Sequence, residues 1–205
     1  SGRAMIVGSR VGAPAPIAAL VNGTIAHSYE LDDTHDATLS HPGSVVISAA
    51  LAVASERNAT GLDFLRAVLA GYECMMRLGL AANAGGVIEF GFHPTAMFGA
   101  FGAATAAAAL MNLPERGLLM AWGHALSLSS GSMQFSDETE GTAIKRIHAG
   151  YAAQQGVLAA EMAEIGIGAP LRAIDGKYGF LKLYGKDPKP ELLRRGGAPL
   201  IVHNI

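Results

Sequence analysis

The sequence predicts an all-α fold, and three observations support this class. Apolar residues recur at three- and four-residue spacing along most of the 205-residue chain. Half of the residues are hydrophobic, only 16% are charged, and alanine and glycine are abundant, which is typical of closely packed helices and not of disordered chains. The valine and isoleucine runs before residue 199 lie within helical periods, so no strand pattern competes. We therefore expect one compact multi-helix domain with a sizeable core, different from a simple four-helix bundle.

Six helices are expected in order along the chain. Pro14 and Pro16 suit the first turn of the first helix. Thr60 followed by Asp63 is a capping box that opens the third helix. Pro114 suits the first turn of the fifth. The expected segments are 15–31, 44–58, 62–83, Pro94 or Thr95 to 111, 115–128 and 147–167.

A domain boundary is expected near residue 187. The segment "GKYGFLKLYGKD" (176–187) ends the dense helical region, and residues 188–205 are rich in proline and glycine. We therefore expect a helical domain over residues 1–187, with an incomplete N-terminus. Residues 188–205 are expected to be a linker or the start of a second domain that this chain does not contain. The sequence thus predicts a piece of a larger protein or a truncated relative.

The composition excludes several functional classes. The net charge is −2 and the isoelectric point is about 6.4, without a basic stripe, so nucleic acid is not an expected partner. Cys74 is the only cysteine, which excludes a disulfide framework and a cysteine-based zinc site. The longest apolar runs, such as 99–113, are too short and too rich in alanine and glycine for a membrane span. With no signal segment at its start, the chain is expected to be cytoplasmic.

Three polar islands interrupt the apolar background: residues 27–41, 91–95 and 142–148. The first lies within "AHSYELDDTHDATLSHPGS" (26–44) and should form a loop, because side chains such as those of Asp32, Asp33 and Thr34 compete with helical hydrogen bonds. Its charged groups are too numerous to bury without partners. They are expected either to face solvent or to line a cavity.

The second and third islands each contain one residue suited to a carboxylate substrate. His93 precedes Pro94 at a probable helix start, where free N–H groups and the helix dipole favour anions; the alternative is that His93 only caps the helix. Lys145 offers a compact positive charge and three donors among small and apolar neighbours. Such a lysine can neutralise a carboxylate or stabilise a developing enolate. The alternative is an ordinary surface lysine.

A metal site is a third interpretation of the first island. His27, His35 and Asp36 loosely resemble the His-Asp pair of the helical metal-dependent phosphohydrolases. Those enzymes draw ligands from several helices, whereas here almost all candidates lie in one loop. Neither an HExxH motif nor a cysteine pair supports a metal. We therefore expect no metal, and interpret these three residues as loop or helix-end residues.

Taken together, the islands resemble the MmgE/PrpD family, which includes 2-methylcitrate dehydratase, cis-aconitate decarboxylase and iminodisuccinate epimerase. The resemblance covers most of residues 11–187 and rests on four ordered segments: 22–44, "GFHPTAMFGAFGAA" (91–104), 141–166 and "GKYGFLKLYG" (176–185). It implies a large all-helical domain joined to a smaller α/β lid, with the site between them, and a homodimer without metal or organic cofactor. The family acts on small di- and tricarboxylates by moving a proton on a carbon next to a carboxylate. Elimination of water, decarboxylation or epimerisation follows.

The resemblance also implies a set of site residues. The family's functional positions fall on Glu30, Asp32, Asp33, Thr34, His41, His93 and Lys145. His41 and His93 would share the acid and base roles, which histidine suits because its ordinary pKa lies near working pH. Lys145 would bind a substrate carboxylate and stabilise charge on it.

The remaining positions would bind the substrate or position it. The acidic residue that opens the family's D-x-D-D-T segment falls on Glu30, a departure in side-chain length. Asp33 and Thr34 would position the substrate or orient a histidine. After the His-Pro turn the chain reads Gly43-Ser-Val, where 2-methylcitrate dehydratases carry Ser-Asp-Asn, and this departure disfavours 2-methylcitrate as the substrate.

The leading hypothesis is the helical domain of a metal-independent MmgE/PrpD-type lyase or isomerase, with its lid missing or truncated. A second hypothesis comes from a different class: a non-catalytic relative that keeps a helical dimer interface. The sequence leaves open the substrate, the reaction among the three, and which histidine is the acid.

Overall fold

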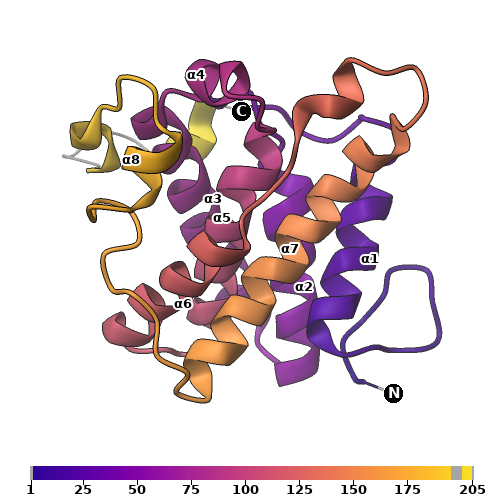
Figure 1. The fold of residues 1–205 in the computed structure, drawn as a ribbon. Helices are drawn as coiled ribbons and strands as arrows, with labels where there is room; N and C mark the ends of the chain where they lie inside the picture. The colour runs from indigo at the N-terminus through magenta and orange to yellow at the C-terminus, as the bar shows by residue number, and fades with distance from the viewer. Residues whose placement is uncertain (1, 195–199, 205) are drawn as a thin grey trace.

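The all-α class is confirmed by a computed structural model that describes residues 2–194 and 200–204 (Figure 1). Within these residues the chain forms eight α-helices and four short 3-10 helices, and its only β-type pairings are isolated bridges. The α-helices are α1 (Ala15–His27), α2 (Pro42–Arg57), α3 (Gly61–Ala82), α4 (Ala84–Glu89), α5 (Pro94–Leu110), α6 (Glu115–Leu128), α7 (Ala143–Glu164) and α8 (Phe180–Tyr184). The 3-10 helices are η1 (Asp36–Thr38), η2 (Met133–Ser136), η3 (Pro190–Leu193) and η4 (Ile201–Asn204).

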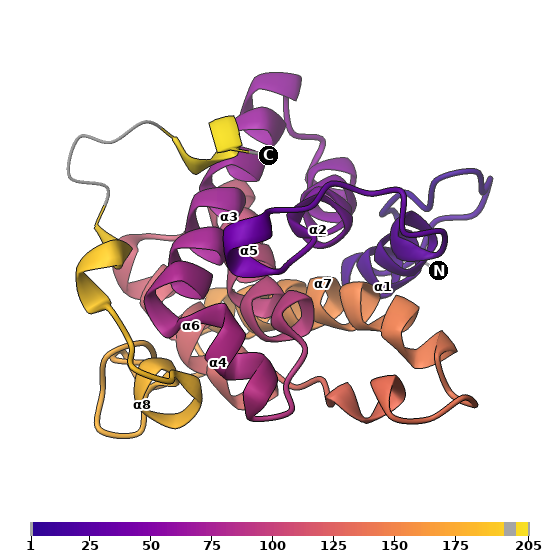
Figure 2. The ribbon, with the colours of Figure 1, turned by 90° about the horizontal axis from the view of Figure 1, so that it is seen from above.

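Helix α5 forms the centre of the core. It packs against α2, α3, α6 and α7, and α1 covers α2 and α7 on the far side (Figures 1 and 2). All of its residues except Ala109 are buried, and most of them are alanine or glycine. Small side chains let neighbouring helices approach closely and pack at the density of a protein interior. The alanine- and glycine-rich composition is thus explained by a central helix that contacts neighbours on all sides.

Two glycines set the depth at which α7 lies against its neighbours. A Cβ atom on Gly23 of α1 would lie 2.9 Å from the Cα of Gly150 in α7. A Cβ atom on Gly156 of α7 would lie 2.7 Å from the carbonyl oxygen of Ala100 in α5. At both crossings the backbones therefore touch, and α7 is fixed against α1 and α5.

We expect Gly156→Ala to destabilise the protein by about 1–3 kcal/mol, since the added methyl group overpacks a backbone contact. The matched control is Gly61→Ala at the start of α3, where a Cβ would meet nothing within 4 Å. That control should be neutral or slightly stabilising. Chemical denaturation of both variants measures the difference, and equal stabilities would contradict the proposed α5–α7 contact.

Several predicted helix boundaries differ from those observed. The first helix was expected to reach residue 31 but ends at His27, because Glu30 adopts a left-handed conformation with φ of 53° that a helix cannot continue. The last long helix begins at Ala143, four residues before its expected start at 147. Lys145 therefore lies on the first turn of α7. The expected capping box is confirmed, because the Thr60 hydroxyl accepts a hydrogen bond of 3.2 Å from the Asp63 N–H.

Two helices begin with the same pair of residues, histidine followed by proline. His41 is the N-cap of α2 with Pro42 next, and His93 is the N-cap of α5 with Pro94 next. Neither histidine side chain caps its own helix. The structure therefore contradicts the alternative in which the His93 side chain only caps the helix.

The end of the chain packs back on the helices where it is described. The segments η3 and η4 contact α3, and Ile201 is buried. Within the predicted 188–205 segment, residues 195–199 and 205 lie outside the described residues. Among the described helices, none combines the length and the apolar character that crossing a membrane requires.

Candidate active site

The three polar islands meet at one end of the helical bundle, at the top of Figure 1. Three contacts join them in pairs. The backbone N–H of His41 donates to the hydroxyl of Thr95 at 3.1 Å, which links the first island to the start of α5. The Nδ1 atoms of His93 and His148 lie 3.0 Å apart, and the ammonium of Lys145 lies 2.7 Å from the carboxylate of Glu30. Segments far apart in the sequence are thus closed into one cluster.

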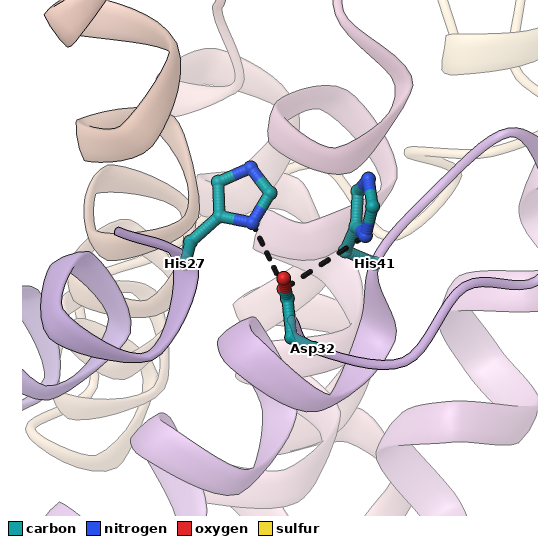
Figure 3. Close-up of side chains that lie close together, drawn as sticks. All are labelled: His27, Asp32 and His41. Carbon is teal, nitrogen blue, oxygen red and sulfur yellow. Dashed lines mark hydrogen bonds and ion pairs between the residues drawn. The ribbon is translucent and has the colours of Figure 1, made fainter. Parts of the chain in front are cut away.

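At the centre of the first island, Asp32 lies between two histidines (Figure 3). Its Oδ2 is 2.9 Å from Nδ1 of His27 and 3.8 Å from Nδ1 of His41. The two imidazole rings lie 4.8 Å apart between centroids. His27 is fully buried at the last position of α1. The sequence correctly placed it at a helix end but gave no sign of this contact.

The hydrogen bonds of His41 define its tautomer. Its Nδ1 is 3.1 Å from the backbone carbonyl oxygen of Asp33 and 3.3 Å from the hydroxyl of Thr34. A carbonyl oxygen can only accept, so Nδ1 carries the proton, and the Nε2 of a neutral His41 is left with a free lone pair. Figure 3 shows this Nε2 pointing away from Asp32. His41 is therefore arranged to accept a proton at Nε2.

Burial keeps His41 neutral near neutral pH. Burial lowers the pKa of His41, and the nearby charge of Asp32 opposes this only in part. Burial alone would raise the pKa of the Asp32 carboxyl, but hydrogen bonds from His27 and Ser44 bring that pKa below its usual value. A carboxylate thus faces His41, whose imidazole remains able to take up a proton.

Asp33 fixes the loop to two helices. One carboxylate oxygen accepts from the N–H of Gly43 at 2.8 Å, and the other accepts from the hydroxyl of Tyr72 at 2.8 Å. Burial and the charge of Asp33 raise the pKa of Tyr72 above its usual value. The carboxylate is thus fully used inside the protein, and the backbone of Asp33 is the part that contacts His41.

His93 and His148 form a second pair of imidazoles, and both side chains are nearly buried. Phe135 lies edge-on to each ring, with centroids 5.5 Å away in both cases. Burial lowers the pKa of His93 to about 3, and burial also lowers the pKa of His148. The sequence placed His148 only near Lys145. The available signal was their three-residue spacing, which puts both side chains on one face of a helix.

Lys145 and Glu30 join the first island to α7. The hydrogen bond from Lys145 lowers the pKa of Glu30 below its usual value. The next residue, Arg146, donates from Nε to the backbone carbonyl of Ser28 at 2.8 Å. These two contacts hold the start of α7 against the loop and leave the Lys145 ammonium partly exposed, with a quarter of the side chain accessible.

The histidine-rich loop does not gather all of its metal-like residues. His35 is buried with its Nδ1 at 2.8 Å from the hydroxyl of Thr38, and Asp36 opens η1 on the surface. Among the described residues, the trio whose donor atoms lie close enough for a metal, within 4.8 Å, is His27, Asp32 and His41. Two helix ends and the loop supply it, and of the residues that the sequence suggested as metal-like, His27, His35 and Asp36, it contains only His27. The Nδ1 atoms of both histidines already face oxygen acceptors.

Two cavities of the protein lie in different places relative to this cluster, one far from it and one beside it. A cavity of about 590 Å³ lies at the opposite ends of α2, α3 and α5, beside Arg57, Asp63 and Asn112. A pocket of about 360 Å³ lies behind the loop and is lined by Asp32, Asp33 and Tyr72 among others. The candidate site is defined by the converging histidines and Lys145 and not by the cavity beside Arg57.

Comparison with known proteins relates the chain to one family. The MmgE/PrpD N-terminal domain family matches residues 1–193. A cis-aconitate decarboxylase-like protein of Aspergillus oryzae is 32% identical over 188 residues, covering 85% of this chain and 38% of that protein. The cis-aconitate decarboxylases of Homo sapiens and Aspergillus terreus are 34% and 31% identical, covering 83% and 82% of this chain and 35% of each enzyme. The chain thus spans little more than a third of the length of these relatives.

Proposed function

The chain belongs to the MmgE/PrpD family, and from this premise we propose that it forms the helical part of a lyase that acts on a small tricarboxylate similar to cis-aconitate. The observation that carries the proposal is the closure of three separate polar islands into one cluster of imidazoles, a lysine and a carboxylate. The decarboxylase relatives favour loss of carbon dioxide over dehydration or epimerisation.

The chemistry follows from the charges of the site. Breaking the bond to a carboxylate releases carbon dioxide and leaves an electron pair, which a conjugated second carboxylate can hold as an enolate. Lys145 binds that carboxylate and stabilises the developing negative charge. The electron pair left on carbon then takes a proton, which His41 or His93 delivers after gaining one from solvent. Thr34 and Glu30 hold His41 and Lys145 in position.

The experiment is a substrate screen with the complete gene product in deuterated water. Cis-aconitate, citrate-like acids and aspartate-derived acids are followed by NMR. We expect decarboxylation of a tricarboxylate with one solvent deuterium in the product, unchanged by a metal chelator. Dehydration or epimerisation would keep the family chemistry and correct the reaction. No turnover of any acid would overturn the proposal.

We expect Asp32→Asn to shift the pH profile of that reaction. The charge of Asp32 raises the pKa of His41, so removing the charge lowers this pKa. Because His41 must carry a proton at Nε2 to give it to the substrate carbon, the basic limb of kcat/KM should move to lower pH, and the maximum rate should fall. The matched control is Asp36→Asn, which removes the same charge from the exposed side of the loop. An unmoved basic limb in Asp32→Asn would argue against His41 as the acid.

Assembly without catalysis is the second candidate function, and one observation favours it. Exposed apolar side chains run along neighbouring faces of α1 and α7: Ile17, Ile25, Ile144, Tyr151 and Leu158. We propose that a second copy of the chain covers this stripe, consistent with the homodimer that the family resemblance implies. Light scattering on Tyr151→Glu tests this, since a dimer that uses the stripe should dissociate.

A further inference from the structure

His93 and His148 contact each other through their Nδ1 atoms, at 3.0 Å. Two nitrogen atoms at this distance need one proton between them, because two lone pairs repel and two N–H groups clash. If both rings are neutral, the ring with the proton on Nδ1 has a bare Nε2. The other ring then has its proton on Nε2. The pair thus presents one acceptor and one donor at its two outer nitrogens.

We propose that His93 and His148 form a proton relay at the candidate site, a role that rests on the proposed function. His148 accepts a proton at Nε2 from solvent and passes its Nδ1 proton to Nδ1 of His93, which gives its own Nε2 proton to the carbon that has lost carbon dioxide. One proton enters, one moves and one leaves, so both rings stay neutral and exchange tautomers. Return of the protons in the opposite sense resets the pair. His148 is accordingly a positioning and relay residue that acts through His93.

The surroundings of the pair favour this neutral exchange. Burial and the positive charge of Lys145 disfavour an imidazolium at His93. A protonated histidine nearby would act in the same direction, and the neighbouring histidines are His27 on α1, His41 before α2 and His148 on α7. Burial and His27 act in the same direction on His148. A single buried histidine would have to become charged when it accepts a proton. A pair that moves the proton onward avoids that charge.

Local packing holds the rings in the geometry that the relay needs. The backbone N–H of His93 donates to the backbone carbonyl of Gly131 at 2.9 Å. Phe135 lies edge-on against both imidazole rings. Among the described residues, three side-chain nitrogen and oxygen atoms are buried without a hydrogen-bond partner: His27 Nε2, Asp32 Oδ1 and Arg77 Nη2. The Nε2 atoms of His93 and His148 are not in this group. Both ends of the relay can therefore exchange protons with their surroundings.

The first test is independent of activity. Imidazole nitrogen shifts are measured by NMR on the protein with 15N-labelled histidine, and His148→Gln and His93→Gln assign the signals. We expect two neutral rings of opposite tautomer between pH 6 and 8. Two rings of the same tautomer, or an imidazolium at neutral pH, would overturn the relay.

The second test measures the protons that move during turnover. Wild-type rates in mixtures of light and heavy water should curve with deuterium content, as two protons in flight require. Glutamine at position 148 can hydrogen bond to His93 but cannot pass a proton, so His148→Gln should lower kcat at least tenfold and make the plot linear. His124→Gln, on α6, is the control. A His148→Gln variant with kcat within twofold of wild type would overturn the relay. Absence of any turnover in the wild-type protein would overturn the proposed function, and the NMR result would then decide the relay by itself.

Discussion

His41→Gln should lower kcat by about 10²–10⁴-fold, the usual contribution of a positioned acid or base. Glutamine can replace the hydrogen bond from Nδ1 to the Asp33 carbonyl but cannot gain and give up a proton at the position of Nε2. The backbone bond to Thr95 is unaffected by the side chain. We therefore expect a folded protein of nearly normal thermal stability that binds substrate and turns it over slowly.

The measurement is steady-state kinetics on the substrate found by the screen, with a melting curve for each variant. His124→Gln is the control, because His124 lies on α6 and contacts the backbone of Ile167. It should keep kcat near the wild-type value. If His41→Gln retains more than a tenth of the wild-type kcat, His41 is not the acid or base.

Lys145→Met should have the second large effect, which is weaker binding of the substrate. A charge-assisted hydrogen bond to a carboxylate contributes about 1.5–3 kcal/mol, which corresponds to roughly 10–100-fold in affinity. The partly exposed pair with Glu30 contributes little to stability. KM should therefore rise by about 10–100-fold, while the melting temperature changes by a degree or two at most.

Lys182→Met removes the same charge from an exposed position on α8 and is the matched control. Lys145→Arg keeps the charge and should recover part of the affinity. An unchanged KM and kcat in Lys145→Met would show that this lysine serves only the surface pair with Glu30.

The fold was predictable because its signals are local. The six long helices carry their periodicity within 13–22 residues each, and caps such as Thr60 mark their starts. Helices α4 and α8 have six and five residues, too few to show a period. The early end of α1 depends on the left-handed backbone of Glu30, for which the sequence offers no glycine. Boundaries of this kind are decided by tertiary contacts.

The site was predictable in outline and not in its pairings. The polar islands stand out against an apolar background, so His41, His93 and Lys145 could be singled out. The partners of these residues could not, because His148 meets His93 across 55 positions of sequence. His27 was set aside as a helix-end residue, since nothing within the loop indicates that it is buried against Asp32. The packing of α7 against α5 brings His148 to His93, and the buried end of α1 brings His27 to Asp32.

The proline after each of His41 and His93 has a consequence for the free energy of ligand binding. A residue before proline is sterically kept out of the helical region, and both histidines have non-helical backbones, with ψ of 84° and 115°. Their helices cannot lengthen backwards by a turn and carry the imidazoles away. The conformational entropy of placing both rings is thus lost when the chain folds, and not when the substrate arrives. Binding energy from the substrate remains available for the reacting bond.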